Sequence, residues 1–68
     1  MVREGDFILI VDTEDTRYLQ IGEILEVGYF AYSTDIAYYM VSFSDKEPVR
    51  YGYDLIIEGK GKVLMFKS

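Results

Sequence analysis

The stretch IAYYMVSFS, residues 36–44, alternates between two kinds of side chain. Every second position from Ala37 to Phe43 is apolar, and the other positions hold Tyr38, a methionine and two serines. Because successive side chains of a β-strand point to opposite faces, this pattern predicts a strand with one buried face. The alternation places Tyr39 in the core and turns Tyr38 away from it.

The preceding segment, residues 18–29, breaks strict alternation. Ile24 and Val27 lie three positions apart, so a flat strand would place them on opposite faces. A helical turn and a bent strand with a β-bulge both bring them together. Gly22 and Gly28, with no helix-capping residue nearby, favour the bent strand.

Further short strands are predicted on both sides of this pair. Residues 6–11 (DFILIV) are β-branched and aromatic, which is typical of a strand buried on much of both faces. Residues 49–53 alternate again after a polar turn. A tight turn then leads to a strand at 56–58, and the turn 58–61 (EGKG) joins it to a strand at 62–66 as a hairpin.

These elements predict a single domain, residues 1–68, with an all-β fold. Five or six short strands with turn signals between them indicate a small antiparallel barrel, in which curvature removes long exposed edges. In one version the C-terminal hairpin extends beyond the barrel. The bent second strand supports a barrel, because the strands of a small barrel turn corners at glycines or bulges.

Two segments resemble the opening of SH3-like barrels of the KOW type. They are EGDFILI, residues 4–10, with a Gly-Asp start, and IGEILEV, residues 21–27, with the spacing Gly-x-hydrophobic-x-x-hydrophobic. Residues 39–43 and 53–55 are similar to the last strands and the short helical turn of these barrels, so the likeness covers roughly residues 4–58. Small photosynthetic and reductase accessory subunits share this plan. The resemblance implies an SH3-like barrel that binds a partner rather than catalyses a reaction.

The residue types argue against an enzyme. Histidine and cysteine are absent, which removes the commonest general base, thiolate metal sites and disulfides. Carboxylate pairs can be drawn between Asp45 and Glu47 or between Asp12 and Asp15, but both fall in polar turns where nothing desolvates them. We therefore expect no catalytic residues, no metal site and no cofactor.

The net charge of −5 lies entirely in the first part of the chain. Residues 1–26 carry seven acids against two arginines, and residues 27–68 carry five acids and five bases. Nucleic acid is an unlikely partner, because phosphate contacts need lysine and arginine. Barrels of the KOW type that contact RNA are usually basic where this chain has acids. The alternative is a KOW-like nucleic-acid- or ribosome-associated module that stacks its aromatics on single strands, which requires a basic patch beside the tyrosines.

The first candidate site is the acidic loop that contains Asp12, Glu14 and Asp15. Such a loop can clamp an arginine or lysine of a partner through charge-assisted hydrogen bonds, as a similar loop does in SH3-like domains that bind proline-rich peptides. A solvated loop that keeps the protein soluble explains the charges equally simply. The ligand spacing of a calcium loop is missing.

The second candidate is a group of tyrosines: Tyr18, Tyr29, Tyr32 and Tyr38. Exposed tyrosines supply the rigid, amphipathic contacts that are common in protein interfaces. The alternative is that they cover the rim of a thin barrel with their hydroxyls in water. We take this group, together with the acidic loop, as the predicted partner-binding site.

The end of the chain is basic, with Lys60, Lys62 and Lys67. These lysines could pair with the acidic first third of another copy to give a homo-oligomer, or they could protect a hairpin edge against aggregation.

The sequence thus predicts a non-catalytic protein-interaction module, or a small acidic inhibitor or accessory subunit, that binds a basic surface or an arginine-containing segment of a protein. A permanent structural subunit of a larger complex is a third interpretation. With no bilayer-length apolar run and no signal-peptide segment after MVREGDF, we expect a cytoplasmic protein that does not bind membranes.

Overall fold

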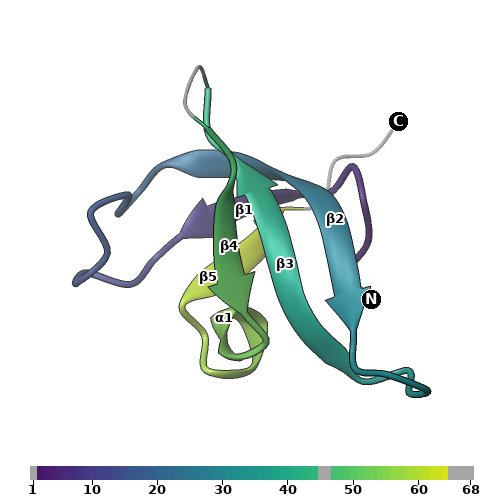
Figure 1. Cartoon of the computed structure of the whole chain (residues 1–68). Helices are drawn as coiled ribbons and strands as arrows, with labels where there is room; N and C mark the ends of the chain where they lie inside the picture. The colour runs from purple at the N-terminus through teal and green to yellow at the C-terminus, as the bar shows by residue number, and fades with distance from the viewer. Residues whose placement is uncertain (1, 45–46, 65–68) are drawn as a thin grey trace.

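The computed structural model describes residues 2–44 and 47–64 (Figure 1). The protein is almost entirely β, which confirms the predicted class. Its elements in chain order are β1 (Phe7–Ile10), β2 (Ile21–Tyr29), β3 (Ile36–Ser42), β4 (Val49–Gly52), α1 (Asp54–Ile57) and β5 (Gly61–Leu64). Within the described ranges, no helix is long enough to cross a membrane.

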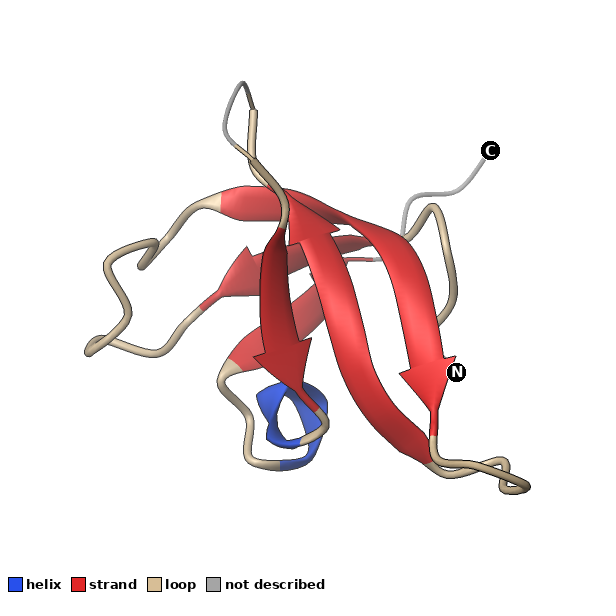
Figure 2. Ribbon diagram, in the orientation of Figure 1, coloured by secondary structure: helices blue, strands red, loops and turns tan. Residues whose placement is uncertain are grey.

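The five strands form one antiparallel sheet in the order β4-β3-β2-β1-β5. The first four strands therefore follow one another as a meander, and β5 returns to the far side of β1. Strands β4 and β5 stand at the two edges and do not pair with each other, so the sheet curls without closing. Figure 2 shows the curled sheet, with α1 between the ends of β4 and β5.

The bend in β2 is the one that the sequence predicts. The pairing of β2 with β3 shifts register between Ile24 and Glu26, which inserts Leu25 as an extra residue. Ile24 is buried, and Val27 packs against the same core. Gly28 lies directly against the ring of Tyr38, where a Cβ atom would overlap the ring.

The core lies on the inner face of the curled sheet and consists of Ile8, Ile10, Ile24, Tyr39, Val41, Phe43 and Leu55. Three of these residues come from the alternating stretch 36–44, as predicted, and Tyr39 is among them. Strand β1 differs from its prediction, because Ile8 and Ile10 are buried whereas Phe7 is exposed and Leu9 is only half-buried. The prediction of burial on much of both faces is therefore wrong, since no second layer covers the outer face of β1 within the described chain.

The predicted hairpin between 56–58 and 62–66 is also wrong. Residues 54–57 form the short helix α1, which buries Leu55, and the turn after it ends in Gly59 at a φ of 72°. The N–H of Gly59 donates to the carbonyl of Ile56 at 3.0 Å, as expected at a helix end. Strand β5 then pairs with β1 and belongs to the sheet. Residues 65 and 66 of the predicted strand lie outside the described residues.

Candidate binding site

The acidic loop between β1 and β2 is built largely from its own hydrogen bonds. An oxygen of the Asp12 carboxylate accepts the N–H of Glu14 at 3.0 Å, and the Asp12 carbonyl accepts the N–H of Asp15 at 3.1 Å. Aspartate side chains favour such turns because they bond to the backbone two residues further on. The sequence of this loop therefore specifies its shape as well as its charge.

Asp15 connects the loop to the rest of the fold. One oxygen of its carboxylate accepts the hydroxyl of Tyr51 on β4 at 2.7 Å, and the other accepts the N–H of Arg17 at 2.8 Å. The Arg17 guanidinium lies 3.7 Å from the same carboxylate and 5.7 Å from the ring centre of Phe43. Only 14% of the Asp15 side chain is exposed. Both oxygens of this predicted binding residue are therefore already engaged within the chain.

The contact also changes the acidity of Tyr51. Burial, followed by the hydrogen bond to Asp15, raises the pKa of Tyr51 to about 12. Both causes disfavour the phenolate, because it is poorly solvated there and would face a carboxylate. The Tyr51 hydroxyl therefore stays protonated near neutral pH and fixes the loop to β4 of the sheet.

The structure separates the predicted tyrosines into three places. Tyr18 lies exposed at the end of the acidic loop, before β2 begins. Tyr29 is the last residue of β2, and Tyr32 follows in the β2–β3 loop, where it is fully exposed at a φ of 56°. A strand of this length separates its ends by roughly 25 Å when extended. The acidic loop and these two tyrosines therefore do not form one surface.

Tyr38 lies on the outer face of β3, where its hydroxyl donates to Glu26 at 3.1 Å. The guanidinium of Arg50 stacks on its ring, 4.4 Å from the ring centre. The hydrogen bond to Glu26, more than any other cause, raises the pKa of Tyr38. Tyr38, like Asp15, is engaged by neighbours of the same chain.

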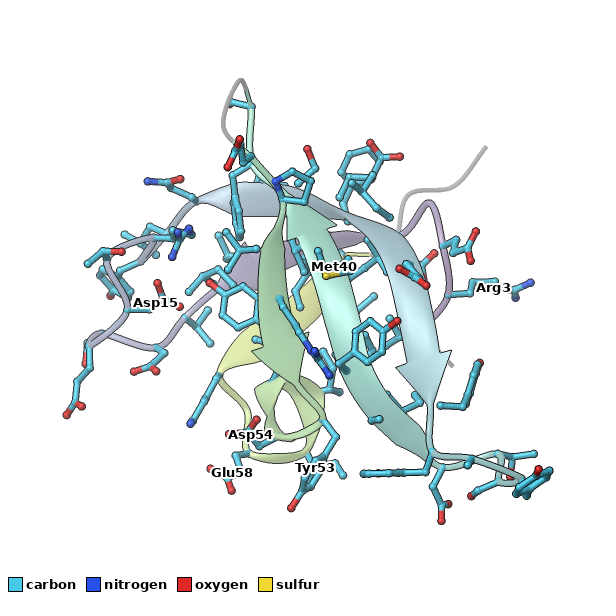
Figure 3. All side chains as sticks on the ribbon, viewed as in Figure 1. Arg3, Asp15, Met40, Tyr53, Asp54 and Glu58 are labelled. Carbon is cyan, nitrogen blue, oxygen red and sulfur yellow. The ribbon has the colours of Figure 1, made fainter. Side chains whose placement is uncertain are left out.

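A groove lies at the end of the sheet where the β2–β3 loop faces α1. It has a volume of about 600 Å³ and is lined by Phe30, Thr34, Asp35, Ile36, Tyr39, Tyr53, Ile56 and Ile57. An adjoining hollow of about 700 Å³ shares three of these residues, Ile36, Tyr39 and Ile56, and continues toward the N-terminal turn. In Figure 3, Tyr53 lies beside α1 and away from Asp15 on the acidic loop.

The walls of the groove present large apolar side chains to solvent. Phe30 and Tyr53 are each about half-exposed, and Ile57 is 77% exposed. Burial, followed by the charge of Tyr29, raises the pKa of Tyr39 in the groove wall. The predicted partner-binding residues do not include Phe30, Tyr53 or Ile57, which line this groove. Phe30 and Tyr53 stand out in the sequence only as members of an aromatic-rich set, and the apolar pair at 56–57 was assigned to a strand.

The charged groups around the groove are mostly acidic. Asp35 forms part of its wall, and its carboxylate makes no hydrogen bond or ion pair with the described residues. Lys60 is held by Asp54 at 3.0 Å and by Glu58 at 3.7 Å. The hydrogen bond between Lys60 and Asp54 lowers the pKa of Asp54 and raises the pKa of Lys60, so these two side chains stay charged. The Lys60 charge is thus neutralised by its own chain.

No cluster of three acidic, histidine or cysteine side chains that could hold a metal ion occurs among the described residues. Comparison with known protein families, with curated proteins and with solved structures found no match for the chain. We therefore infer its function from the surface of this chain alone.

Proposed function

We propose that this chain is a small SH3-like barrel that acts as a non-catalytic protein-interaction module, as an accessory subunit or inhibitor of its partner. The strand order and the helical turn before the last strand support the SH3-like assignment. The groove between the β2–β3 loop and α1 carries the proposal. It binds an apolar segment of the partner that includes an arginine or lysine.

The apolar part of this specificity follows from the exposed walls of the groove. Phe30, Tyr53 and Ile57 lie around a concave surface, and covering them removes apolar area from water at about 25 cal/mol per Å². Aromatic side chains around a hollow are also the usual centres of interface energy. A concave apolar surface on a small domain is a better candidate than single exposed tyrosines, because a partner side chain can be enclosed there.

The basic part follows from the charges. Asp35 lies in the groove wall with its carboxylate open to a cation, and Glu58 is exposed on the turn after α1. The acidic loop acts from a distance, since its surplus charge attracts a basic partner and speeds association. In this proposal Asp12, Glu14 and Asp15 contribute to the rate of encounter more than to the final contacts.

A nucleic-acid partner is less well supported. It requires free basic side chains beside the tyrosines, but three of the five described cations are engaged by neighbours within the chain. Arg17 is bound to Asp15, Arg50 is stacked on Tyr38, and Lys60 is bound to Asp54. Single-stranded RNA or DNA that bound the protein at low salt would favour the nucleic-acid alternative.

The experiment compares two exposed residues, Ile57 in the groove and Tyr18 at the end of the acidic loop. Partners are pulled down from nuclease-treated native lysate with tagged wild-type protein and with the tagged variants Ile57→Ser and Tyr18→Ser. We expect Ile57→Ser to lose the partner and Tyr18→Ser to keep it, because only Ile57 lies in the groove. Purified partner is then titrated against both variants and against Asp35→Asn at low and raised salt. Loss with Tyr18→Ser and retention with Ile57→Ser would move the site to the acidic loop.

A further inference from the structure

The outer face of the sheet formed by β5, β1 and β2 carries an ordered set of side chains. In the register of these strands, Lys62 and Ile21 flank Leu9 in one row. Leu64 and Glu23 flank Phe7 in the next row. Partners in a register share a face, and Ile8 and Ile10 point inward, so both rows point outward.

This outer face is unusually apolar for a surface in water. Ile21 is 52% exposed and Leu25, the bulge residue, is 43% exposed. Leu9 is half-buried beside Ile21, its partner on β2, and Leu25 lies further along β2 beyond Glu23. The solvent-facing side of an antiparallel sheet normally carries polar residues. Large aliphatic side chains next to one another on that side therefore mark an interaction surface.

The charges on this face occupy opposite corners. Lys62 and Glu23 are both exposed, on the two strands that flank β1 and in different rows. The spacing of strands and residues puts their Cα atoms about 12 Å apart. Among the described residues, neither has an ion-pair partner.

We infer that this face, the β5-β1-β2 outer face, binds a second copy of the same chain. A twofold axis along the diagonal from Ile21 to Leu64 places Lys62 of each copy opposite Glu23 of the other. The aliphatic side chains then pack between two identical ion pairs, with the strands of the two sheets crossing steeply. A self-complementary pattern of this kind fits a second copy better than an unrelated partner.

The dimer is weak and depends on ionic strength. Each copy carries a net charge of −5, so the copies repel at low salt. At physiological salt the screening length is about 8 Å, which screens that repulsion more than it weakens the close Lys62–Glu23 pairs. None of the residues that line the groove belongs to this face, so the dimer leaves the groove free, whereas Phe7 and Leu64 of the face also line the adjoining hollow.

The experiment measures mass by sedimentation equilibrium over a wide range of concentration at physiological salt. We expect wild-type protein to dimerise, and Lys62→Glu and Glu23→Lys each to weaken the dimer about tenfold or more, because both ion pairs become like-charged. Mixing the two variants in equal amounts restores a dimer, since each copy then supplies the charge that the other needs. A purely structural role for Lys62 or Glu23 gives no such rescue.

A second variant, Ile21→Asp, tests the apolar centre, and Ile57→Ser in the groove is the matched control. We expect Ile21→Asp to abolish the dimer and Ile57→Ser to leave it unchanged, with urea unfolding confirming that both remain folded. Wild-type protein that is monomeric at every concentration overturns the inference. A dimer that survives Ile21→Asp and the single charge reversals, or one that Ile57→Ser abolishes, also overturns it.

Discussion

The acidic loop and the groove lie at different ends of β2 and differ in whether their polar and apolar side chains have partners within the chain. In the loop, the carboxylates of Asp12 and Asp15 accept hydrogen bonds from the chain itself, and Tyr51 holds Asp15 against the sheet. In the groove, Phe30 and Ile57 stand in solvent and the Asp35 carboxylate has no described partner. A concentration of charge in a sequence can thus serve folding, whereas a surface left unsatisfied by the fold is available to a partner.

The largest expected effect contrasts two residues of α1. Leu55 is buried, so Leu55→Ala should lower the free energy of unfolding by about 3 kcal/mol through lost packing and a cavity. Ile57→Ser should change it by no more than about 0.5 kcal/mol, because its side chain is mostly exposed. Urea unfolding of both variants measures the difference. A large loss with Ile57→Ser would make Ile57 a structural residue and weaken the case for the groove.

The next effect tests whether Asp15 serves the fold. Asp15→Ala should lower the free energy of unfolding by about 2 kcal/mol, because it leaves the Tyr51 hydroxyl and the Arg17 N–H without their acceptor. Tyr51→Phe, the control, removes one of these bonds and should cost about 1 kcal/mol. Chemical unfolding at neutral pH provides the measurement. Unchanged stability of Asp15→Ala would return Asp15 to the set of residues free to bind a partner.

The same contact predicts a smaller effect at alkaline pH. The pKa of Tyr51 is raised from the ordinary value of 10.0 to about 12, so the contribution of its protonated form is fully present below pH 10.0. That contribution is lost as the pH rises through about 12. Thermal or urea unfolding across this range should show a steeper decline for wild-type protein than for Tyr51→Phe. Parallel curves would mean that the Tyr51 hydroxyl does not hold the loop in solution.

The smallest expected effect concerns Glu14, an exposed acid of the loop. Glu14→Gln should leave the free energy of unfolding within about 0.5 kcal/mol, because no described group depends on its carboxylate. Its effect on the partner should be confined to a slower association at low salt, measured by stopped-flow or surface binding kinetics. A faster dissociation at physiological salt would show that Glu14 touches the partner, contrary to a site in the groove.

Much of the sheet could be predicted because its signals are local. The alternation in 36–44 and the irregular spacing of Ile24 and Val27 each identify a strand, and the structure confirms the strand and the bulge. Residues 54–58 carried conflicting signals, because the resemblance implies a short helical turn at 53–55 whereas two adjacent isoleucines fit a strand or a helical turn equally well. Their conformation is set by Leu55, which fills the end of the core, and by the turn at Gly59.

The site was harder to predict because it is made by distant segments. The groove brings Phe30 of the β2–β3 loop and the first residue of β3 against Tyr53 and Ile57 of α1 and its start. No spacing along the chain indicates that these residues lie together. The tyrosines that the sequence grouped together are divided because β2 runs between them.

The sequence by itself determined the all-β class, the two faces of β3, the bulge and the excess of negative charge, since periodicity and composition act over a few residues. Only the tertiary structure decided which side chains remain without a partner in the chain. It gives Asp15 and Tyr38 hydrogen-bond partners, leaves the outer side of β1 exposed and forms the groove beside α1. The physical reason is that burial and hydrogen bonding are settled between segments far apart in the chain, and the free surface is what remains after those contacts form.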